Sequence, residues 1–598
     1  MRKKKSVPVV PAALPPNDGI RPSWPAWAAA LLIAVLGLAA YAGALGGEFV
    51  YDDARLVQNN LYIKQWAHLG RIFTEDIGAG AGSIYNHYNF YRPLQMLSYM
   101  VDHTLWGREP FGYHLTSVLC HVAAALAFFV FACMVTGDRR AGFAAAALYV
   151  VHPVHVEAVA YIAGRADSLV AFFMLVCLIM YLKHLASGRT AAYLISLAAF
   201  VAACMSKEYA LITPAFIALY HYAFRKAWRW RAFAPFLGIL AAYLLLRATV
   251  FNFPVVGRPQ HGALFERLPG MFIAYFEYIR LIVLPVGLHM EYGSSLFRLA
   301  EPRALAGAAL LAGTAWLLAR ARRSSPVAFF SLGWFLVGLL PVSNLFPINA
   351  YLAEHWLYVP LMGVAILAGQ GLAALGRGAR LRAVAVAVFI AAVAYLAALT
   401  VRQNGYWKDS ITFYETTLHF SPDNGRIYAN LATEYLRLGR HEKAVEVYKT
   451  AIANMRDTAG AYNNLGITYA SLGRNAEAVE AYRKAIEENP SFAEAYNNLG
   501  VSYAEMGDRA GAVEAFGRAI ELNPGYADAY NNLGSELADP QAAIAAYERA
   551  LAADPYHASA CYNLGRAYEA AGRPADAERM RARSRALQAP GSRERMRL

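Results

Sequence analysis

The sequence predicts an all-α protein, in which a bundle of about eleven membrane-spanning helices precedes a C-terminal α-solenoid of helical repeats. Its 598 residues are 58% hydrophobic and only 16% charged, which lies outside the range of ordinary soluble domains. Apolar runs long enough to cross a hydrocarbon core alternate with short basic clusters. From about residue 404 the hydropathy drops and a repeat begins.

The net charge of +13 does not indicate a nucleic-acid partner. The basic residues occur in short clusters between apolar runs, as they do in cytoplasmic loops of membrane proteins. The cysteines have neither the spacing of a disulfide framework nor that of a metal site, and so leave the redox compartment open. They are Cys120, Cys133, Cys177, Cys204 and Cys561.

The N-terminal part is predicted to anchor the chain. Residues 1–23 are basic and rich in proline, and we expect them on the cytoplasmic side. The apolar segment from Trp24 to Leu45 follows, and its length favours an uncleaved signal anchor over a cleaved signal peptide. The predicted transmembrane domain begins here and covers residues 24–403.

Ten further spans are expected in that domain, at about 113–136, 141–151, 167–185, 191–205, 208–223, 232–250, 303–319, 327–343, 358–375 and 382–401. Between them, Phe272–Pro285 is apolar but contains Glu277 and Arg280. If this segment does not cross the membrane, the basic clusters that follow it lie on the same side of the membrane as the N-terminal lysines. We therefore predict an interfacial or re-entrant helix there, and a C-terminal domain on the non-cytoplasmic face.

The repeats have the pattern of AYNNLGITYASLGRNAEAVEAYRKAIEENP. Leucines recur about every 34 residues, the period of tetratricopeptide (TPR) repeats, with one shortened interval; they are Leu431, Leu465, Leu499, Leu533 and Leu564. We predict a TPR solenoid over residues 404–585, made of a half repeat and about five repeats, and a basic tail at 586–598.

An asparagine precedes each of these leucines: Asn430, Asn464, Asn498, Asn532 and Asn563. Such a row along one face of a solenoid predicts a peptide-binding site, because carboxamides hydrogen-bond a peptide backbone without reading its sequence. The alternative is that these side chains are simply solvated.

Polar residues of the transmembrane domain collect at the predicted non-cytoplasmic ends of different helices. They are Asp52, Asp53, Arg92, His152, His155, Glu157, Arg165, Asp167, Lys207, Glu208, Glu354 and His355. Ionisable residues at membrane depth are costly, so their convergence predicts a functional site. For single members there are structural alternatives: a solvated loop for Asp52–Asp53, an interfacial anchor for Lys207–Glu208, and packing for the histidines.

Two further alternatives concern charge and metal. Arg165 and Asp167 could form a structural ion pair. The spacing of His152 and His155 also occurs in metal sites, but no third ligand is evident, so a divalent metal is not favoured and no cofactor is assigned.

The chemistry that fits these residues is transfer of a sugar from a lipid phosphate. An acceptor hydroxyl needs a carboxylate as general base, and the departing phosphate needs cations such as Lys207, Arg165 or Arg92. One base and one cationic site suffice for a single inverting displacement.

Five stretches resemble one family: FVYDDARLVQNN, YRPL, HPVHVEAVAYIAGRADSL, SKEYALITP and AEHWLYVP. With the C-terminal repeats they resemble the transmembrane and TPR-containing O-mannosyltransferases, of the GT-C glycosyltransferase class. The resemblance implies that Asp52 or Asp53 is the catalytic base, that a polyprenyl-phosphate sugar is the donor, and that mannose is the sugar. It also implies a donor-binding role for the other polar residues and a protein hydroxyl as acceptor. Family members commonly have arginine where this chain has His355.

Two other functions stay open. One is a non-catalytic TPR scaffold for an envelope or secretion complex, with a decayed transferase domain as its anchor. The other is a transferase that acts on a lipid-linked glycan. The chain has no Asn-x-Ser/Thr site, no retention tail, and many Ala, Arg and Gly residues, so we expect a bacterial inner membrane with the TPR domain in the periplasm.

Overall fold

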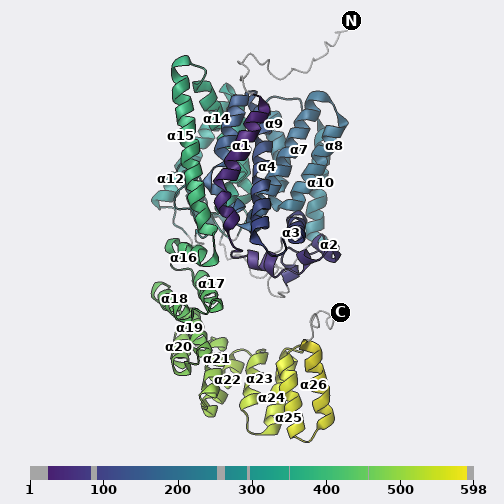
Figure 1. Cartoon of the computed structure of the whole chain (residues 1–598), viewed down its shortest axis with the longest axis vertical. Coiled ribbons are helices and arrows are strands. Elements are labelled where there is room, and N and C mark those ends of the chain that lie inside the picture. The colour runs from purple at the N-terminus through teal and green to yellow at the C-terminus, as the bar shows by residue number, and fades with distance from the viewer. Residues whose placement is uncertain are drawn as a thin grey trace. The chain divides into compact units, whose positions relative to one another are not determined.

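The computed structural model describes residues 25–81, 90–251, 263–292, 297–348, 350–455 and 457–588, and these residues form helices joined by loops (Figure 1). The predicted all-α class is therefore confirmed for them. The chain divides into two compact units, Met1–Thr416 and Thr417–Leu598. The basic segment 1–23 and tail residues 589–598 lie outside the described residues.

The first unit contains one helix or helical pair at each of the eleven predicted spans. Its α-helices are α1 (Ala26–Ala40), α2 (Leu69–Ile72), α3 (Pro93–Trp106), α4 (Pro110–Thr136), α5 (Arg139–Val150), α6 (Val156–Val159), α7 (Ala166–Ser187), α8 (Thr190–Ser206), α9 (Thr213–Ala223), α10 (Trp230–Thr249), α11 (Leu264–Val283), α12 (Pro302–Ser324), α13 (Pro326–Leu339), α14 (Pro360–Leu375) and α15 (Ala379–Asn404).

Five of these helical segments are long and apolar enough to cross a membrane, and a sixth is added if α5 and Pro153–Val159, which meet at a 55° bend, form one span. The five contain α4, α7, α10, α12 and α15. Helices α1, α8, α13 and α14 are apolar but shorter. The total of eleven spans is thus not confirmed and stays a prediction.

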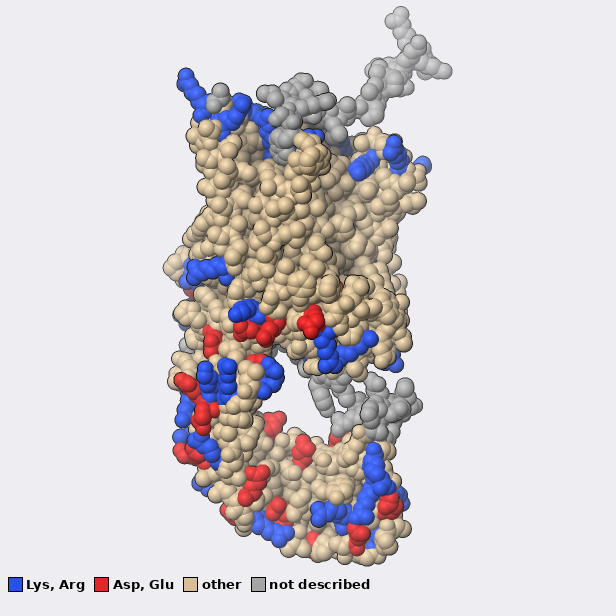
Figure 2. Space-filling view, viewed as in Figure 1, with Lys and Arg blue, Asp and Glu red and all other residues tan. Residues whose placement is uncertain are grey.

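The burial of these helices separates a core from an apolar outer surface. In the most apolar window of α4, 61% of the residues are buried, against 17% in α10, α12 and α15. Figure 2 shows the result: a broad band of the bundle without charge, between two charged ends. A soluble protein rarely exposes so large an apolar surface.

The two ends of the bundle differ in charge. One end, which we call the acidic end, contains four acidic residues. Asp52 follows α1, Asp167 lies in the first turn of α7, Glu208 follows α8, and Glu354 precedes α14. The basic end lies at the C-terminal ends of α7 and α9. There the Tyr181 hydroxyl oxygen of α7 lies 2.9 Å from Nε2 of His221 in α9.

Helix α11 covers the segment predicted to be interfacial or re-entrant. Near its start, Arg267 donates to the carbonyl of Asn344, which follows α13. Near its end, the carbonyl of Ile282 lies 3.1 Å from Nε2 of His152, which follows α5. The C-terminal parts of α5 and α13 both contact the segment before α14, through Tyr149 and Trp334. Both ends of α11 therefore lie at the acidic end, which favours a helix that does not cross.

A small hydrophobic core holds the loop after α1 in place. Phe49, Leu56 and Ile63 from this loop pack with Tyr99 of α3 and Ile162. The loop contains the π-helical turn Ala54–Gln58. The loop that carries the acidic pair is therefore anchored by packing against α3 and the segment before α7.

The second unit is the predicted TPR solenoid. The helix α16 (Ser410–Phe420) precedes five antiparallel pairs: α17 (Gly425–Arg437), α18 (His441–Asn454), α19 (Ala459–Ser471), α20 (Asn475–Glu488), α21 (Ala493–Glu505), α22 (Arg509–Leu522), α23 (Ala527–Glu536), α24 (Pro540–Ala553), α25 (Ala558–Ala570) and α26 (Pro574–Gln588). The shortened repeat interval corresponds to α23, of ten residues. The predicted boundary at residue 404 differs from the end of the first unit, because Trp407 and Phe413 pack inside that unit, on Tyr161 and Tyr51.

Candidate functional site

The acidic pair lies in the loop after α1. Tyr51, directly before the pair, has a φ of 56°, which is rare for a residue with a side chain and often accompanies function. The Asp53 carboxylate accepts hydrogen bonds from Val50 N at 3.1 Å and from Ala163 N at 2.8 Å. The pair is thereby attached to the loop that begins α7.

The two carboxylates differ in accessibility. The Asp53 side chain is buried, with 1% exposed, and burial raises its pKa to about 8 against the weaker opposing effect of its two backbone hydrogen bonds. Asp52 is half-buried, and the Tyr161 hydroxyl lies beside it. The Tyr161 ring stacks on Trp407, with 4.8 Å between ring centroids.

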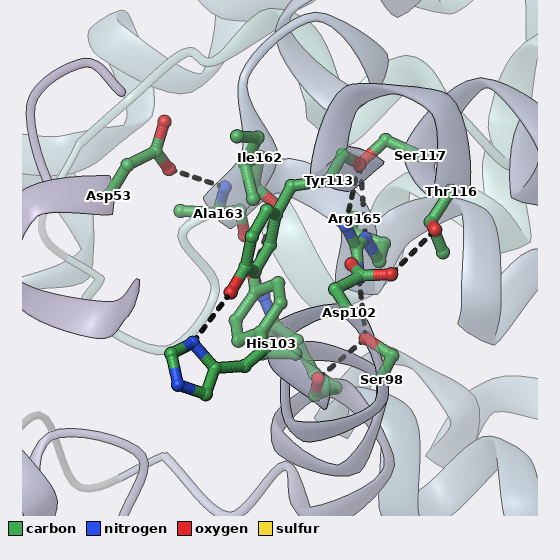
Figure 3. A network of polar contacts seen from close by, with 12 residues as sticks. Asp53, Ser98, Asp102, His103, Tyr113, Thr116, Ser117, Ile162, Ala163 and Arg165 are labelled. Carbon is green, nitrogen blue, oxygen red and sulfur yellow. Dashed lines mark hydrogen bonds and ion pairs between the residues drawn. The ribbon is translucent and has the colours of Figure 1, made fainter. Parts of the chain in front are cut away.

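Arg165, two residues after Ala163, lies in a buried network of polar contacts (Figure 3). Its guanidinium is fully buried and forms an ion pair with Asp102 at 2.6 Å. It also donates to Ser98, Ser117 and the carbonyl of Tyr113. The carboxylate partner is thus Asp102 and not Asp167. These contacts connect the residue before α7 with α3 and α4.

A second group joins α7, α8 and the start of α3. The Lys207 ammonium donates to both carboxylate oxygens of Asp167, at 2.6 and 2.8 Å. Nε of Arg92 donates to Glu208 at 3.2 Å, and the backbone N–H of Tyr91 donates to the other oxygen of Glu208. Burial lowers the pKa of Lys207, and the Asp167 carboxylate opposes that shift.

A third group lies where α6 meets the segment before α14. Nδ1 and the backbone N–H of His355 each contact the Glu157 carboxylate, at 2.8 and 3.0 Å. The His355 side chain remains 25% exposed. Glu354 is buried and accepts hydrogen bonds from His289 N and the Tyr292 hydroxyl. Burial, and next the nearby Glu157 charge, raise the pKa of Glu354 well above its usual value.

The remaining two histidines are buried among aromatic rings. Nε2 of His152 contacts the Ile282 carbonyl. The His155 ring lies 4.3 Å from Tyr149 and 4.6 Å from Tyr358, and in the described part of the chain neither ring nitrogen has a hydrogen-bond partner. No group of three His, Cys, Asp or Glu residues that could hold a metal ion is found within the described residues.

The structure thus brings the predicted residues of the transmembrane domain to one end of the bundle, where most of them form three groups, and His152 and His155 belong to none of the three. Their catalytic and donor-binding roles stay predictions. Sequence reasoning missed Asp102, Tyr161 and Tyr292. Asp102 could have been found as the carboxylate in the otherwise mostly apolar stretch MLSYMVDHTLW. The sequence gives no comparable signal for Tyr292.

The predicted asparagine row contacts its own solenoid. Asn498, Asn532 and Asn563 each donate to an asparagine of the preceding repeat, namely Asn463, Asn497 and Asn531, over 3.0, 3.0 and 2.9 Å. Asn464 has no such acceptor, because the equivalent position in the preceding repeat is Ala429. Asn464 instead lines a cavity of about 210 Å³ between the first two repeats.

Together these features define a class of protein: an apolar helical bundle with a polar site at one end, joined to TPR repeats. Models of the tetratricopeptide repeat match residues 432–473, 468–507, 493–526 and 535–589. The crystal structure of MamA is 26% identical, covers 28% of this chain and 98% of its own, and has a TM-score of 0.25.

The curated relatives are named protein O-mannosyl-transferases, which confirms the family resemblance. The chain is 28% identical to F38B6.6 of Caenorhabditis elegans over 419 residues, which are 67% of this chain and 59% of the relative. It is 25% identical to TMTC4 of Homo sapiens over 494 residues, which are 72% of this chain and 66% of the relative. The chain therefore spans less than two thirds of the length of either relative.

Proposed function

We propose that this protein is a membrane glycosyltransferase of the GT-C class, which moves mannose from a polyprenyl-phosphate donor to a serine or threonine hydroxyl of a protein. The observation that carries the proposal is the acidic pair: one half-buried carboxylate, Asp52, on a loop that is held in place by its buried neighbour Asp53. The names of the relatives support a transferase and do not favour the scaffold alternative.

Asp52 is the better candidate for the base. A general base has to come within hydrogen-bond reach of the proton that it removes. Asp53 is buried and both of its oxygens accept backbone N–H groups, so an acceptor hydroxyl cannot reach it. Asp52 is partly exposed. In this proposal Asp52 takes the hydroxyl proton, the oxygen attacks the anomeric carbon with inversion, and the lipid phosphate leaves.

The phosphate would be held by cations of the second and third groups. Arg92 is fixed through Nε, and its terminal nitrogens have no hydrogen-bond partner among the described residues. Nδ1 of His355 is held by Glu157, and a protonated imidazole would donate to phosphate from its partly exposed side. Arg165 would act at a distance, by fixing the loop that carries Ala163.

The apolar outer surface of the bundle supports an integral membrane location. We further infer that the acidic end faces the periplasm of a bacterium, since the basic clusters of the loops favour the cytoplasmic side for the other end. The TPR solenoid would bind the acceptor protein, and Asn464, which lines the cavity between the first two repeats, is a candidate for that contact.

The test is sugar transfer by the purified protein in liposomes, with labelled polyprenyl-phosphate mannose and a periplasmic protein extract. We expect label on protein with wild type and with the control Glu48→Gln, which changes an exposed carboxylate of the same loop, and none with Asp52→Asn. If wild type transfers nothing from any polyprenyl-phosphate sugar while the TPR domain still binds partners, the scaffold function replaces the proposal.

A further inference from the structure

A second site is indicated at the basic end of the bundle, away from the acidic end. A cavity of about 750 Å³ lies there, between the α9–α10 connection and the ends of α12 and α13. Helix α9 begins five residues after Glu208 and ends at the cavity, so the whole length of this helix separates the cavity from the acidic end. This volume is in the range of pockets that hold small ligands.

The cavity is lined by cations that have no acidic partner. Arg225, Lys226 and Arg322 all line it, and none of them has a carboxylate within 4.0 Å among the described residues. All other lining residues are apolar, aromatic or histidine. Three unpaired positive charges around one concave site attract an anion, and arginine pairs especially well with the oxygens of a phosphate.

The backbone at the cavity is held in an uncommon conformation. Arg225 has a φ of 50°, which an arginine adopts only when its surroundings impose it. The backbone N–H of Lys226 is fixed by the His221 carbonyl at 3.0 Å. On the other side, the Arg322 guanidinium lies over the Tyr222 ring, 5.0 Å from its centroid. The cations are therefore positioned by local structure from both sides.

The aromatic residues around the cavity indicate where it lies. Trp228 lines it, and Trp230 packs edge-on against Trp228, with 5.3 Å between ring centroids. Both tryptophans and Tyr222 are substantially exposed. Tryptophan and tyrosine concentrate at the level of lipid head groups, where one side of the ring is apolar and the other is wet. Figure 2 shows lysine and arginine, and no acidic residue, on the visible face of this end.

We propose that this cavity binds the phosphate group of an anionic lipid. Basic pockets between transmembrane helices on the cytoplasmic side are suited to such head groups, because charge and aromatic contacts act together there. The inference takes the membrane location and the cytoplasmic side of this end from the proposed function, and it does not depend on sugar transfer.

The experiment measures lipid retention by the full chain in nanodiscs that contain phosphatidylcholine with a minor fraction of phosphatidylglycerol. Phosphatidylglycerol bound after detergent extraction is counted by native mass spectrometry. We expect at least one such lipid to be retained in preference to phosphatidylcholine, and retention to fall about tenfold in Lys226→Gln/Arg322→Gln. The matched control is Arg320→Gln, which removes an exposed charge from the same helix outside the cavity.

Each outcome decides the proposal. Selective retention that is lost in the double variant and kept in Arg320→Gln supports it. Equal retention of both lipids, or equal loss in the control, overturns it, since general surface charge would then explain the binding. Glycerol phosphate added to the discs that contain phosphatidylglycerol gives the remaining arm: loss of the retained phosphatidylglycerol at a low concentration of glycerol phosphate would assign the site to a soluble phosphate instead. Sugar transfer assayed on the same samples reports separately on the proposed function.

Discussion

The backbone N–H of Ala163 donates a 2.8 Å hydrogen bond to the carboxylate of Asp53, 110 positions earlier in the chain. This bond connects the loop after α1 to the loop that precedes α7, and so to the buried Arg165 two residues further on. It gives the two aspartates of the pair different tasks: Asp53 holds the loop, and Asp52 is left at the surface of the site.

The first prediction concerns this division of tasks. Asp52→Asn should reduce sugar transfer by roughly 10² to 10⁴-fold, the usual contribution of a general base, and leave the melting temperature unchanged. Asp53→Ala should lower both, because Val50 N and Ala163 N lose their acceptor. Transfer assays and thermal unfolding of the same preparations check this. A normal rate in Asp52→Asn, with loss only in Asp53→Ala, would assign the base to Asp53.

The second prediction is a pH dependence of stability. The pKa of Asp53 is raised to about 8 in the folded protein, whereas a free aspartate has a pKa of about 3.9. The folded state therefore binds more protons than the unfolded state between these values, and stability falls as the pH rises through this window. From about pH 5 to about pH 8 the melting temperature of wild type should fall more than that of Asp53→Asn. If the melting temperatures of wild type and Asp53→Asn change with pH in parallel, the raised pKa of Asp53 is contradicted.

The third prediction tests the buried ion pair of Arg165 and Asp102. Removing one partner, as in Arg165→Met, leaves an uncompensated buried charge and should destabilise the bundle by roughly 3–5 kcal/mol. The double variant Arg165→Met/Asp102→Leu should recover much of that loss. The double-mutant cycle is read from thermal unfolding in detergent. If the loss of stability in the double variant equals the sum of the losses in Arg165→Met and Asp102→Leu, the two residues are not energetically coupled.

The fourth prediction separates structural from binding asparagines in the solenoid. Asn497→Ala removes the acceptor for the half-buried Asn532 amide and should lower the stability of the repeats by about 0.5–1.5 kcal/mol, the usual net contribution of a hydrogen bond. Asn464→Ala breaks no inter-repeat bond and should leave stability unchanged while it weakens binding of acceptor protein. Thermal unfolding and a pull-down with the periplasmic extract distinguish the two. Unaltered binding by Asn464→Ala would remove the peptide-binding hypothesis for that residue.

Much of the fold was predictable because its signals are local. Apolar runs predicted segments at which the bundle has helices, although α3 was not among them, and the repeat period predicted the helix pairs of the solenoid. The number of spans was harder, since α8, α9, α13 and α14 are shorter than a standard crossing and hydropathy alone does not say which short helices cross. The first compact unit extends beyond residue 404, because Trp407 and Phe413 have side-chain partners about 250 and 360 positions away, which no local pattern shows.

The sequence by itself determined the residue types of the site, the order of its motifs, and the clustering of polar residues at the expected ends of helices. Only the tertiary structure decided which of them pair: Arg165 with Asp102, Lys207 with Asp167, His355 with Glu157. It also decided which carboxylate of the Asp52–Asp53 pair is accessible. The physical reason is that hydropathy and repeat period depend on neighbours in the chain, whereas ion pairing and burial depend on helices that meet only when the bundle has packed.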